Sequence, residues 1–350
     1  MMDSFSATVS RMAALEARVA SDPGRFRVLT GERPTGRLHL GHYFGTVRER
    51  VRLQGLGVET VLVLADYQVI TDRDTADNGA TNVRDAILDY LAAGMDRAAT
   101  TIFTHSSVPA LNQLLLPFLS LVTEVELRRN PTVKAELAAS GRSLSGLMLT
   151  YPVHQAADIL FCKANLVPVG KDNLPHVELT RTVARRFNDR FGAVFPEPEA
   201  LITRAPEVPG LDGRKMSKSY GNAIALSMTA DETAAVVRRT LTDAERRITF
   251  DPTGRPGVSA LLTTAALCTD STPEAIAEEL GNGGGRALKE FTIEAVNTRF
   301  AQHRRRRAEL AKDPGLITDV LNAGNRRANE VAEATLDEVR AAMGMNYSAP

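Results

Sequence analysis

The chain has 350 residues, 43% of them hydrophobic and 24% charged, which is enough for one large or two ordinary globular domains. Its 42 basic and 42 acidic residues give a net charge of zero, which excludes a uniformly basic nucleic-acid-binding protein and leaves local patches for any RNA contact. Cys162 and Cys268 stand in apolar surroundings outside any paired motif, which argues against a disulfide framework or structural zinc. We therefore expect a reducing, cytoplasmic location.

The first 24 residues are predicted to form a helical extension, because Met12, Leu15 and Val19 recur at helical spacing. Acidic residues occur among them and a continuous apolar segment does not, so residues 1–24 lack the pattern of a signal peptide. No run of about 18 apolar residues occurs in the sequence, so neither a membrane span nor a membrane partner is expected.

From residue 25 to about residue 192, apolar strand-like runs alternate with helical patterns. The runs cover residues 26–29, 58–65, 101–103 and 166–169. This alternation predicts an α/β fold, a Rossmann-like doubly wound parallel sheet, in a first domain over residues 25–222. Because ligands bind beyond the carboxyl ends of such strands, the segments of interest are 31–42, 66–72, 105–109 and 170–176.

After residue 222 the pattern is helical only. We expect an all-helical domain over residues 223–325, interrupted by loops at 251–257 and 281–285. A final segment over residues 326–350, with Leu336 and Val339 on one face, is predicted to form a helix that packs back on the first domain.

Two short stretches are predicted to form one nucleotide-binding site together. In the first, residues 31–42, a turn rich in glycine leads from a strand into a helix whose first turn carries His39 and His42 on one face. A helix N-terminus offers free N–H groups that suit a phosphate, and Gly41 leaves room for a flat ring such as adenine against the backbone. The second stretch is the lysine- and serine-rich segment 215–219.

The His39–His42 turn resembles the first signature of class I aminoacyl-tRNA synthetases, and residues 215–219 resemble the second. Residues 151–160, 167–181 and 255–259 resemble segments of the tryptophanyl-tRNA synthetases in particular, and the similarity covers roughly residues 26–345. Gln155 and Gln68 stand where many bacterial members carry methionine and histidine. These departures indicate a divergent second type of bacterial enzyme.

The resemblance implies a tryptophan–tRNA ligase. Such an enzyme activates L-tryptophan with ATP to tryptophanyl-adenylate and pyrophosphate, then transfers the amino acid to the 3′-terminal ribose of tRNA(Trp). It implies ATP and Mg²⁺ as cofactors, a homodimer in the cytoplasm, and a helical domain that binds the tRNA anticodon region. No protein ligand for a metal is expected, because Mg²⁺ bridges phosphate oxygens with few protein contacts.

The resemblance also implies roles for individual residues. The catalytic group is His39, His42, Lys215 and Lys218. The ATP-binding group is Arg33, Pro34, Thr35, Gly41, His42, Gly170, Lys171, Asp172, Val208, Lys215, Met216, Ser217, Lys218 and Ser219. The tryptophan-binding group is Asp158, Tyr151, Gln155, Gln68 and Gly31.

A physical argument supports the role that the resemblance implies for Asp158. It stands in a helix of small and apolar residues, where an ionised carboxylate is costly unless it is paired. An indole N–H can only donate, so an acceptor-only carboxylate is a good partner for it. The alternative is an ordinary helix carboxylate that an arginine or a backbone N–H satisfies.

Other interpretations remain open. The chain could be a tyrosyl-specific synthetase, although Asp158 and its segment count against this. It could be a non-catalytic paralogue that binds tryptophan and ATP as a sensor or partner, or a small-molecule adenylyltransferase; neither needs the lysine stretch together with a helical domain. The basic segments 128–134 and Arg304–Arg307 are either contacts with ATP and tRNA, respectively, or solvated faces.

Overall fold

The computed structural model describes residues 4–70, 78–134, 145–170, 173–202, 208–214, 216 and 220–347. Its centre is a parallel five-stranded sheet in the order β3-β2-β1-β4-β5. The strands are β1 (Arg27–Glu32), β2 (Glu59–Leu64), β3 (Thr100–Thr104), β4 (Leu166–Val169) and β5 (Glu199–Ile202). The predicted doubly wound parallel fold is confirmed. The order reverses between β1 and β4, which is where such a sheet binds its ligands.

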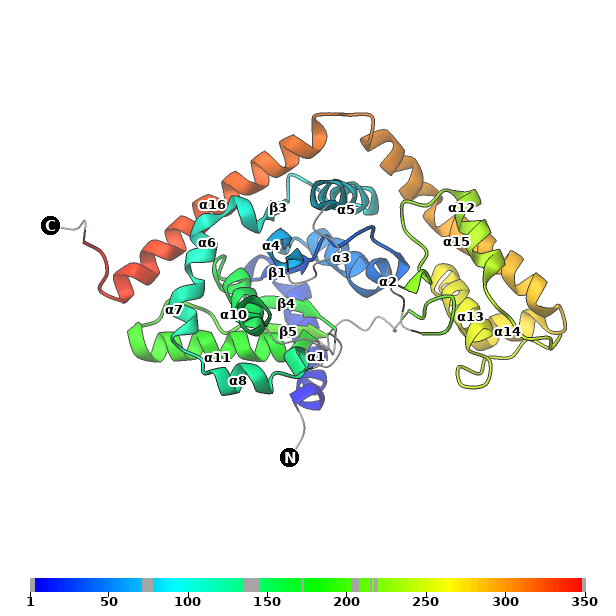
Figure 1. The fold of residues 1–350 in the computed structure, drawn as a ribbon, viewed down its shortest axis with the longest axis horizontal. Helices are drawn as coiled ribbons and strands as arrows, with labels where there is room; N and C mark the ends of the chain where they lie inside the picture. Colours follow the sequence, from blue (N-terminus) through cyan, green and yellow to red (C-terminus); the bar gives the residue numbers. More distant parts are fainter. Residues whose placement is uncertain are drawn as a thin grey trace.

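The helices divide into those around the sheet and those beyond it (Figure 1). Around the sheet lie α1 (Ser4–Ser21), α2 (Leu40–His42), the π-helical turn η2 (Tyr43–Val47), α3 (Arg48–Gly55), α4 (Asp66–Val69), α5 (Gly79–Ala93), the 3-10 turn η4 (His105–Ser107), α6 (Pro109–Gln113), α7 (Leu115–Leu119), α8 (Glu124–Arg129), α10 (Gly146–Leu160) and α11 (Leu174–Phe191). Beyond it lie α12 (Ala230–Arg239), α13 (Pro256–Thr269), α14 (Pro273–Leu280) and α15 (Gly284–Leu310), and α16 (Leu316–Ala342) returns to the sheet. None of the described helices is long and apolar enough to cross a membrane.

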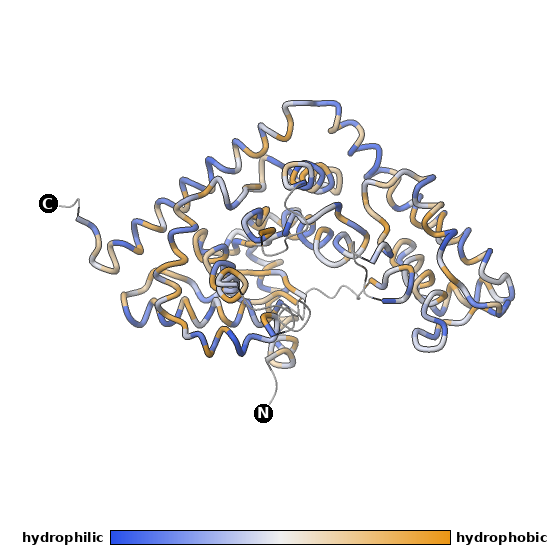
Figure 2. The backbone as a smooth tube through the Cα atoms, in the orientation of Figure 1, coloured by the Kyte–Doolittle hydropathy of each residue, from blue (hydrophilic) through white to orange (hydrophobic). Residues whose placement is uncertain are grey.

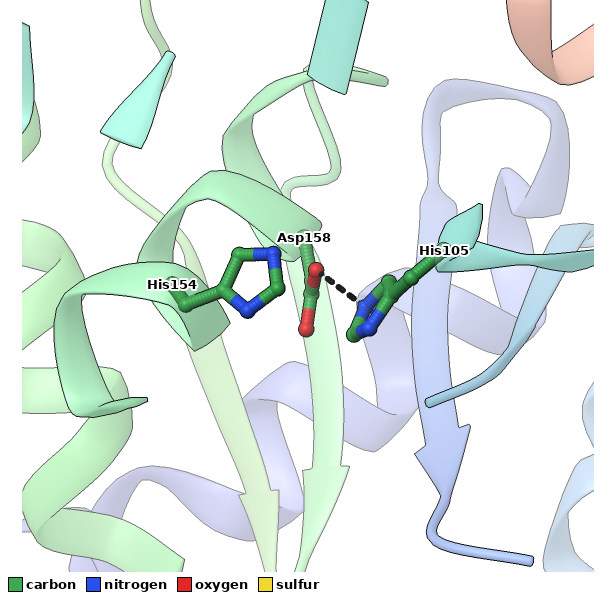
Figure 3. Close-up of side chains that lie close together, drawn as sticks. All are labelled: His105, His154 and Asp158. Carbon is green, nitrogen blue, oxygen red and sulfur yellow. Dashed lines mark hydrogen bonds and ion pairs between the residues drawn. The ribbon is translucent and has the colours of Figure 1, made fainter. Parts of the chain in front are cut away.

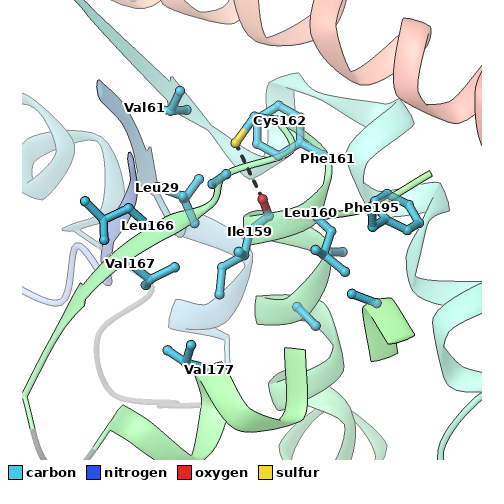
Figure 4. Packing of buried hydrophobic residues seen from close by; sticks show 14 of the residues in the cluster. Leu29, Val61, Ile159, Leu160, Phe161, Cys162, Leu166, Val167, Val177 and Phe195 are labelled. Atoms are coloured by element: carbon cyan, nitrogen blue, oxygen red, sulfur yellow. Dashed lines mark hydrogen bonds between the residues drawn. The ribbon is translucent and has the colours of Figure 1, made fainter. Parts of the chain in front are cut away.

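Successive residues of the central strands feed two hydrophobic cores, because side chains alternate between the faces of a sheet. Val61 and Val63 of β2 belong to the core that includes α10, whereas Leu62 and Leu64 belong to the core shared with the C-terminal helices. Figure 4 shows Val61 and neighbouring strand residues packed against Ile159 and Leu160 of α10 and against Phe161, which follows the helix. The first core therefore fixes the helix that carries Asp158.

Two sequence expectations require correction. β5 lies beyond residue 192, where the strand-and-helix alternation was expected to stop, because four residues after a proline-rich turn give too short a pattern to recognise. The predicted boundary between residues 325 and 326 falls inside α16, which is one uninterrupted helix of 27 residues. The assignment of nucleotide binding to the first domain and of tRNA binding to the helical domain stays a prediction.

Helix α16 covers the edge of the sheet. It packs on β3 and α6, and hydrophobic and hydrophilic residues alternate along it as expected for a helix with one buried face (Figures 1 and 2). The amide of Thr104 donates to Asn325 Oδ1 (3.1 Å), and Arg327 donates to the carbonyl of Thr100 (2.9 Å). Side chains of α16 thus satisfy backbone groups that an edge strand would otherwise leave unpaired.

Gly324 sets the depth of this contact, and its substitution is a test of it. A Cβ atom at Gly324 would lie 1.8 Å from the carbonyl oxygen of Ile102 in β3. Gly324→Val should therefore push α16 off the strand and reduce the free energy of unfolding by about 1–3 kcal/mol, the usual cost of overpacking. Urea denaturation measures the change, with Glu330→Ala on the exposed face of α16 as the control. An unchanged midpoint for Gly324→Val would show that the close approach does not exist in solution.

One member of the four-arginine run, Arg307, has a structural role. Arg307 donates to Asp89 (2.8 Å) and to Asp85 (2.6 Å) of α5, while Arg305 and Arg306 are exposed. Burial raises the pKa of Asp89 to about 7, although Arg307 opposes the shift. His303 lies beside this pair, and burial lowers its pKa to about 4, so it is neutral. Arg307 therefore joins α15 to α5. The sequence analysis considered only a tRNA contact or a solvated face for this run, and neither describes Arg307.

Removal of Arg307 should destabilise the protein. Arg307→Met leaves Asp89 buried without its cation, and we expect a loss of about 3 kcal/mol at pH 8, the low end for a buried ion pair because Arg307 is partly exposed. A raised folded-state pKa means that Asp89 takes up a proton as the pH falls through 7, so the loss should shrink at pH 5. Urea titrations at both pH values measure it, with Arg306→Met as the exposed control. An equal loss at both pH values would contradict the assignment.

Candidate active site

The first signature stretch begins inside the sheet. Gly31 and Glu32 continue β1 and pair in register with Val63 and Leu64, so the strand runs past the apolar residues 26–29 that marked it in the sequence. A Cβ atom at Gly31 would lie 3.0 Å from Val63 Cγ1, which accounts for glycine in a strand. Arg33, Pro34 and Thr35 then form the predicted turn.

The two signature histidines lie against each other. His39 caps α2 with extended backbone, and the ring centroids of His39 and His42 are 3.8 Å apart. The backbone N–H of His39 donates to His42 Nδ1 (3.1 Å), so the proton of a neutral His42 sits on Nε2, 3.6 Å from Glu32 Oε1. The expected proximity of the two rings at a helix N-terminus is therefore present.

A buried arginine supports the end of β1. Arg50 of α3 donates to the carbonyl of Gly31 (2.9 Å) and to the hydroxyl of Tyr90 (2.5 Å), and it lies 3.9 Å from Glu32. Burial raises the pKa of Tyr90, so its hydroxyl stays protonated. These contacts hold the strand end from which the turn and both histidines follow.

The two signature stretches meet in space although they are far apart in the sequence. Leu40 N–H donates to the carbonyl of Ile224 (3.0 Å), and Leu226 N–H donates to that of Leu38 (2.9 Å). A Cβ atom at Gly41 would lie 3.7 Å from Met216 Sδ, and Met216 is buried in the same core as Leu40. The chain after the second stretch is thus hydrogen-bonded to the first.

The remaining predicted ATP-binding residues divide into two sets. Gly170 follows β4 directly, on the other side of the switch point from β1, and Val208 is buried in the core that contains Met216. Lys171, Asp172, Lys215, Ser217, Lys218 and Ser219 lie outside the described residues.

A cavity of about 1040 Å³ opens between the turn and the C-terminal helices. Thr35, Arg37 and His39 line one side, and Arg239 and Arg255 line the other. Its volume is at the upper end of the range for small-molecule sites in proteins. Arg255 is bound to Asp243 (2.6 Å), which holds the pKa of that carboxyl below its usual range, so this arginine is already committed.

A second cluster lies at the carboxyl end of β3 and on α10. Tyr151, Gln155 and Asp158 share one face of α10, at spacings of four and three residues. Asp158 is buried, and its Oδ1 accepts from His105 Nε2 at 2.7 Å. Gln68 Nε2 lies 3.5 Å from Oδ2, the long limit of a hydrogen bond. Among the described residues, neither an arginine nor a backbone N–H bonds to Asp158. The alternative interpretation, a helix carboxylate with one of these two partners, is therefore wrong about the partner.

Asn112 contacts both histidines that flank Asp158; Figure 3 shows the two histidines and the carboxylate. Its Nδ2 donates to the carbonyls of His105 (2.9 Å) and Val108 (3.0 Å), so its Oδ1 must accept from His154 Nε2 at 2.8 Å. His154 therefore carries its proton on Nε2. Burial lowers the pKa of His154. Burial also opposes charge on His105, but the carboxylate of Asp158 outweighs it and raises the pKa of that imidazole.

Comparison with known proteins identifies the family. Residues 21–301 match the family of class I tRNA synthetases (W and Y). The chain belongs to this family. Tryptophan–tRNA ligases from Clostridium longisporum and Streptococcus pyogenes serotype M1 are 40% and 41% identical to it over 91% of this chain and 97% and 98% of theirs. The structure of tryptophanyl-tRNA synthetase from Campylobacter jejuni, complexed with ADP and tryptophan, is 28% identical with a TM-score of 0.79, over 91% of this chain and 99% of that one.

In this class I synthetase chain, the Asp158 cluster could be mistaken for a metal centre. The ligand-capable atoms of His105, His154 and Asp158 lie within 4.8 Å of one another. Both histidine Nε2 atoms are nevertheless engaged, one with Asp158 and the other with Asn112. The cluster is therefore a hydrogen-bonded network whose geometry needs no metal.

His105, Asn112 and His154 were not among the predicted site residues. The topology rule did mark residues 105–109, because they follow β3, and His154 stood inside the segment that carried the resemblance. What the sequence could not supply is that Asn112, one turn into the next helix, ties the two histidines together.

Gly41 offers a direct test of the histidine turn. A Cβ atom there would lie 3.0 Å from His39 Nδ1 and Cε1, so Gly41→Ala should displace the His39 ring without disturbing the core. We expect amino-acid-dependent ATP–pyrophosphate exchange to fall at least about tenfold, because misplaced binding groups lose transition-state contacts. Gly45→Ala, in the adjoining turn with no atom within 4 Å of the added carbon, is the matched control. Equal activity of the two variants would exclude a role for the ring position.

Proposed function

We propose that this chain is an ATP-dependent tryptophan–tRNA ligase. Its family and its relatives at about 40% identity support the reaction class. The observation that carries the choice of amino acid is the buried carboxylate of Asp158, with Oδ2 directed away from its histidine partner and toward Gln68. An acceptor-only group in a buried site can bind an indole N–H and reject phenylalanine, which lacks a donor.

The mechanism needs no protein nucleophile. The carboxylate of tryptophan attacks the α-phosphorus of ATP and pyrophosphate leaves. The ribose hydroxyl of the tRNA end then attacks the carbonyl carbon of the mixed anhydride, and AMP leaves. The protein contributes position and charge stabilisation. His39 and His42 would contact phosphate oxygens from the start of α2, with Arg33, Pro34, Thr35 and Gly41 lining the nucleotide.

The pyrophosphate and ribose ends of ATP are assigned to loops. Lys215 and Lys218 would hold the leaving pyrophosphate, and the contact of Met216 with Gly41 supports their approach to the histidine turn. Gly170 would place Lys171 and Asp172 beside the ribose, across the switch point. Mg²⁺, when bound, would neutralise charge on the phosphates. The donor set suits a metal held by ATP itself, because Glu32 is engaged by His42, Arg50 and Tyr90.

The tRNA and assembly assignments are part of the same proposal. The helices α12–α15 would bind the anticodon region of tRNA(Trp), with the exposed Arg305 and Arg306 as phosphate contacts. We propose a homodimer that works in the cytoplasm.

The test is ATP–pyrophosphate exchange with each amino acid, followed by charging of tRNA. We expect exchange with tryptophan and none with tyrosine or phenylalanine. Asp158→Ala should lose exchange with tryptophan by at least about a hundredfold, since it removes a charged acceptor worth about 3 kcal/mol. Lys215→Ala should lose exchange but keep tryptophan binding. If no amino acid supports exchange although ATP binds, the chain is not a ligase.

A further inference from the structure

The protonation state of Asp158 decides what it can recognise. A carboxylate buried among small and apolar residues takes up a proton unless a donor or a cation holds it ionised. The ionised form only accepts hydrogen bonds, whereas the acid also donates. An indole N–H only donates, so the site distinguishes tryptophan well only while Asp158 carries its charge. A neighbouring hydrogen-bond donor or cation must therefore stabilise the carboxylate form.

His105 is the group in the right place. No lysine or arginine pairs with Asp158 among the described residues, and His105 Nε2 is its one short contact there. Among the described residues, the titratable groups around the pair are His154 from α10 and Asp66 and Tyr67 from α4, and Gln68 of α4 lies nearest to Oδ2. His154 is held as the Nε2–H tautomer by Asn112 and makes no hydrogen bond to Asp158. Among these groups, His105 is the short-range donor.

The position of His105 is fixed from three sides. Asp66 accepts from the backbone N–H of Ser106 (3.1 Å) and from the Ser106 hydroxyl, and Asn112 donates to the carbonyl of His105 (2.9 Å). The His154 ring lies beside it, with centroids 4.5 Å apart (Figure 3). The 3-10 turn η4 therefore presents Nε2 to Oδ1 in one orientation.

We propose that His105 is the positioning residue of the tryptophan site: its Nε2–H donates to Oδ1 of Asp158, stabilises the carboxylate form and leaves Oδ2 for the indole N–H. This inference rests on the proposed function, because it takes Asp158 as the indole acceptor. Nε2 donates whether His105 is neutral or protonated, so titration of His105 does not break the contact. Tryptophan binding should therefore depend little on pH in the native protein.

The experiment measures tryptophan affinity from pH 6 to pH 9. The chain contains no tryptophan, so indole fluorescence excited at long wavelength belongs to the ligand alone. In His105→Leu the carboxyl group keeps only the long contact with Gln68, and the loss of its short donor should favour the neutral acid. We expect the Kd for tryptophan to rise at least about tenfold at pH 6.5 and to recover by roughly tenfold per pH unit, the slope of a single ionisation. The affinity for ATP should not change.

Three further variants separate positioning from packing. His105→Gln keeps an N–H donor at similar reach without titrating, and it should bind tryptophan with nearly native affinity at every pH. His105→Asn is polar but too short to reach Asp158, so it should repeat the pH dependence of the leucine variant and replaces it if that variant does not fold. His154→Leu removes a buried histidine that has no bond to Asp158, and any weakening should be independent of pH.

Each outcome bears on a different claim. A Kd raised by the same factor at all pH values in His105→Leu and His105→Asn would reduce His105 to a packing residue and overturn the inference. Stoichiometric zinc in the purified protein, with tryptophan binding altered by a chelator, would make the cluster a metal site and overturn it too. Absence of tryptophan binding and exchange in the native protein would instead overturn the proposed function.

Discussion

The arrangement of the site depends on one backbone contact between segments that lie far apart in the sequence. Residues 33–39 leave a strand and enter a helix, and residues 224–226 pair with Leu38, His39 and Leu40. This pairing places Met216 next to Gly41 and brings the C-terminal helices beside the large cavity. The wall of the large cavity follows from it, since one side comes from the turn and the other from the segment that the turn holds.

Buried charge is used at the junctions of the fold and seldom inside a single element. Arg50 joins α3 to the end of β1, Arg307 joins α15 to α5, and His105 joins the end of β3 to α10. In each case the two partners lie on different elements. The cost of burying the charge is therefore offset only when the two elements are correctly docked. Such pairs specify geometry more than they add stability. They also explain why polar side chains interrupt otherwise apolar helices.

The fold was predictable from the sequence to the extent that apolar runs are long. β2 and its neighbours gave clear patterns, whereas β5 has four residues and escaped notice. For the site, the geometry of the signature turn was predictable, because a strand-to-helix turn with histidines three residues apart places both rings together. The role of Asp158 came from the family resemblance and stays a prediction. The histidine network was not, since it depends on Asn112 pointing its amide at two carbonyls, which is a three-dimensional fact. Arg307 was misjudged for a related reason: a run of like charges says nothing about which of its members faces inward.

The placement of α16 has a consequence for how the protein is made. The strand β3 leaves the ribosome roughly 200 residues before the helix that satisfies its outer edge. At about 5–20 residues per second, translation keeps that edge exposed for roughly 10–40 seconds. During this interval the nascent sheet has an open hydrogen-bonding edge and an uncovered apolar face, so neighbouring nascent chains on one message present one another with a surface for pairing. The arrival of α16, and not the collapse of the sheet, is the event that closes this edge.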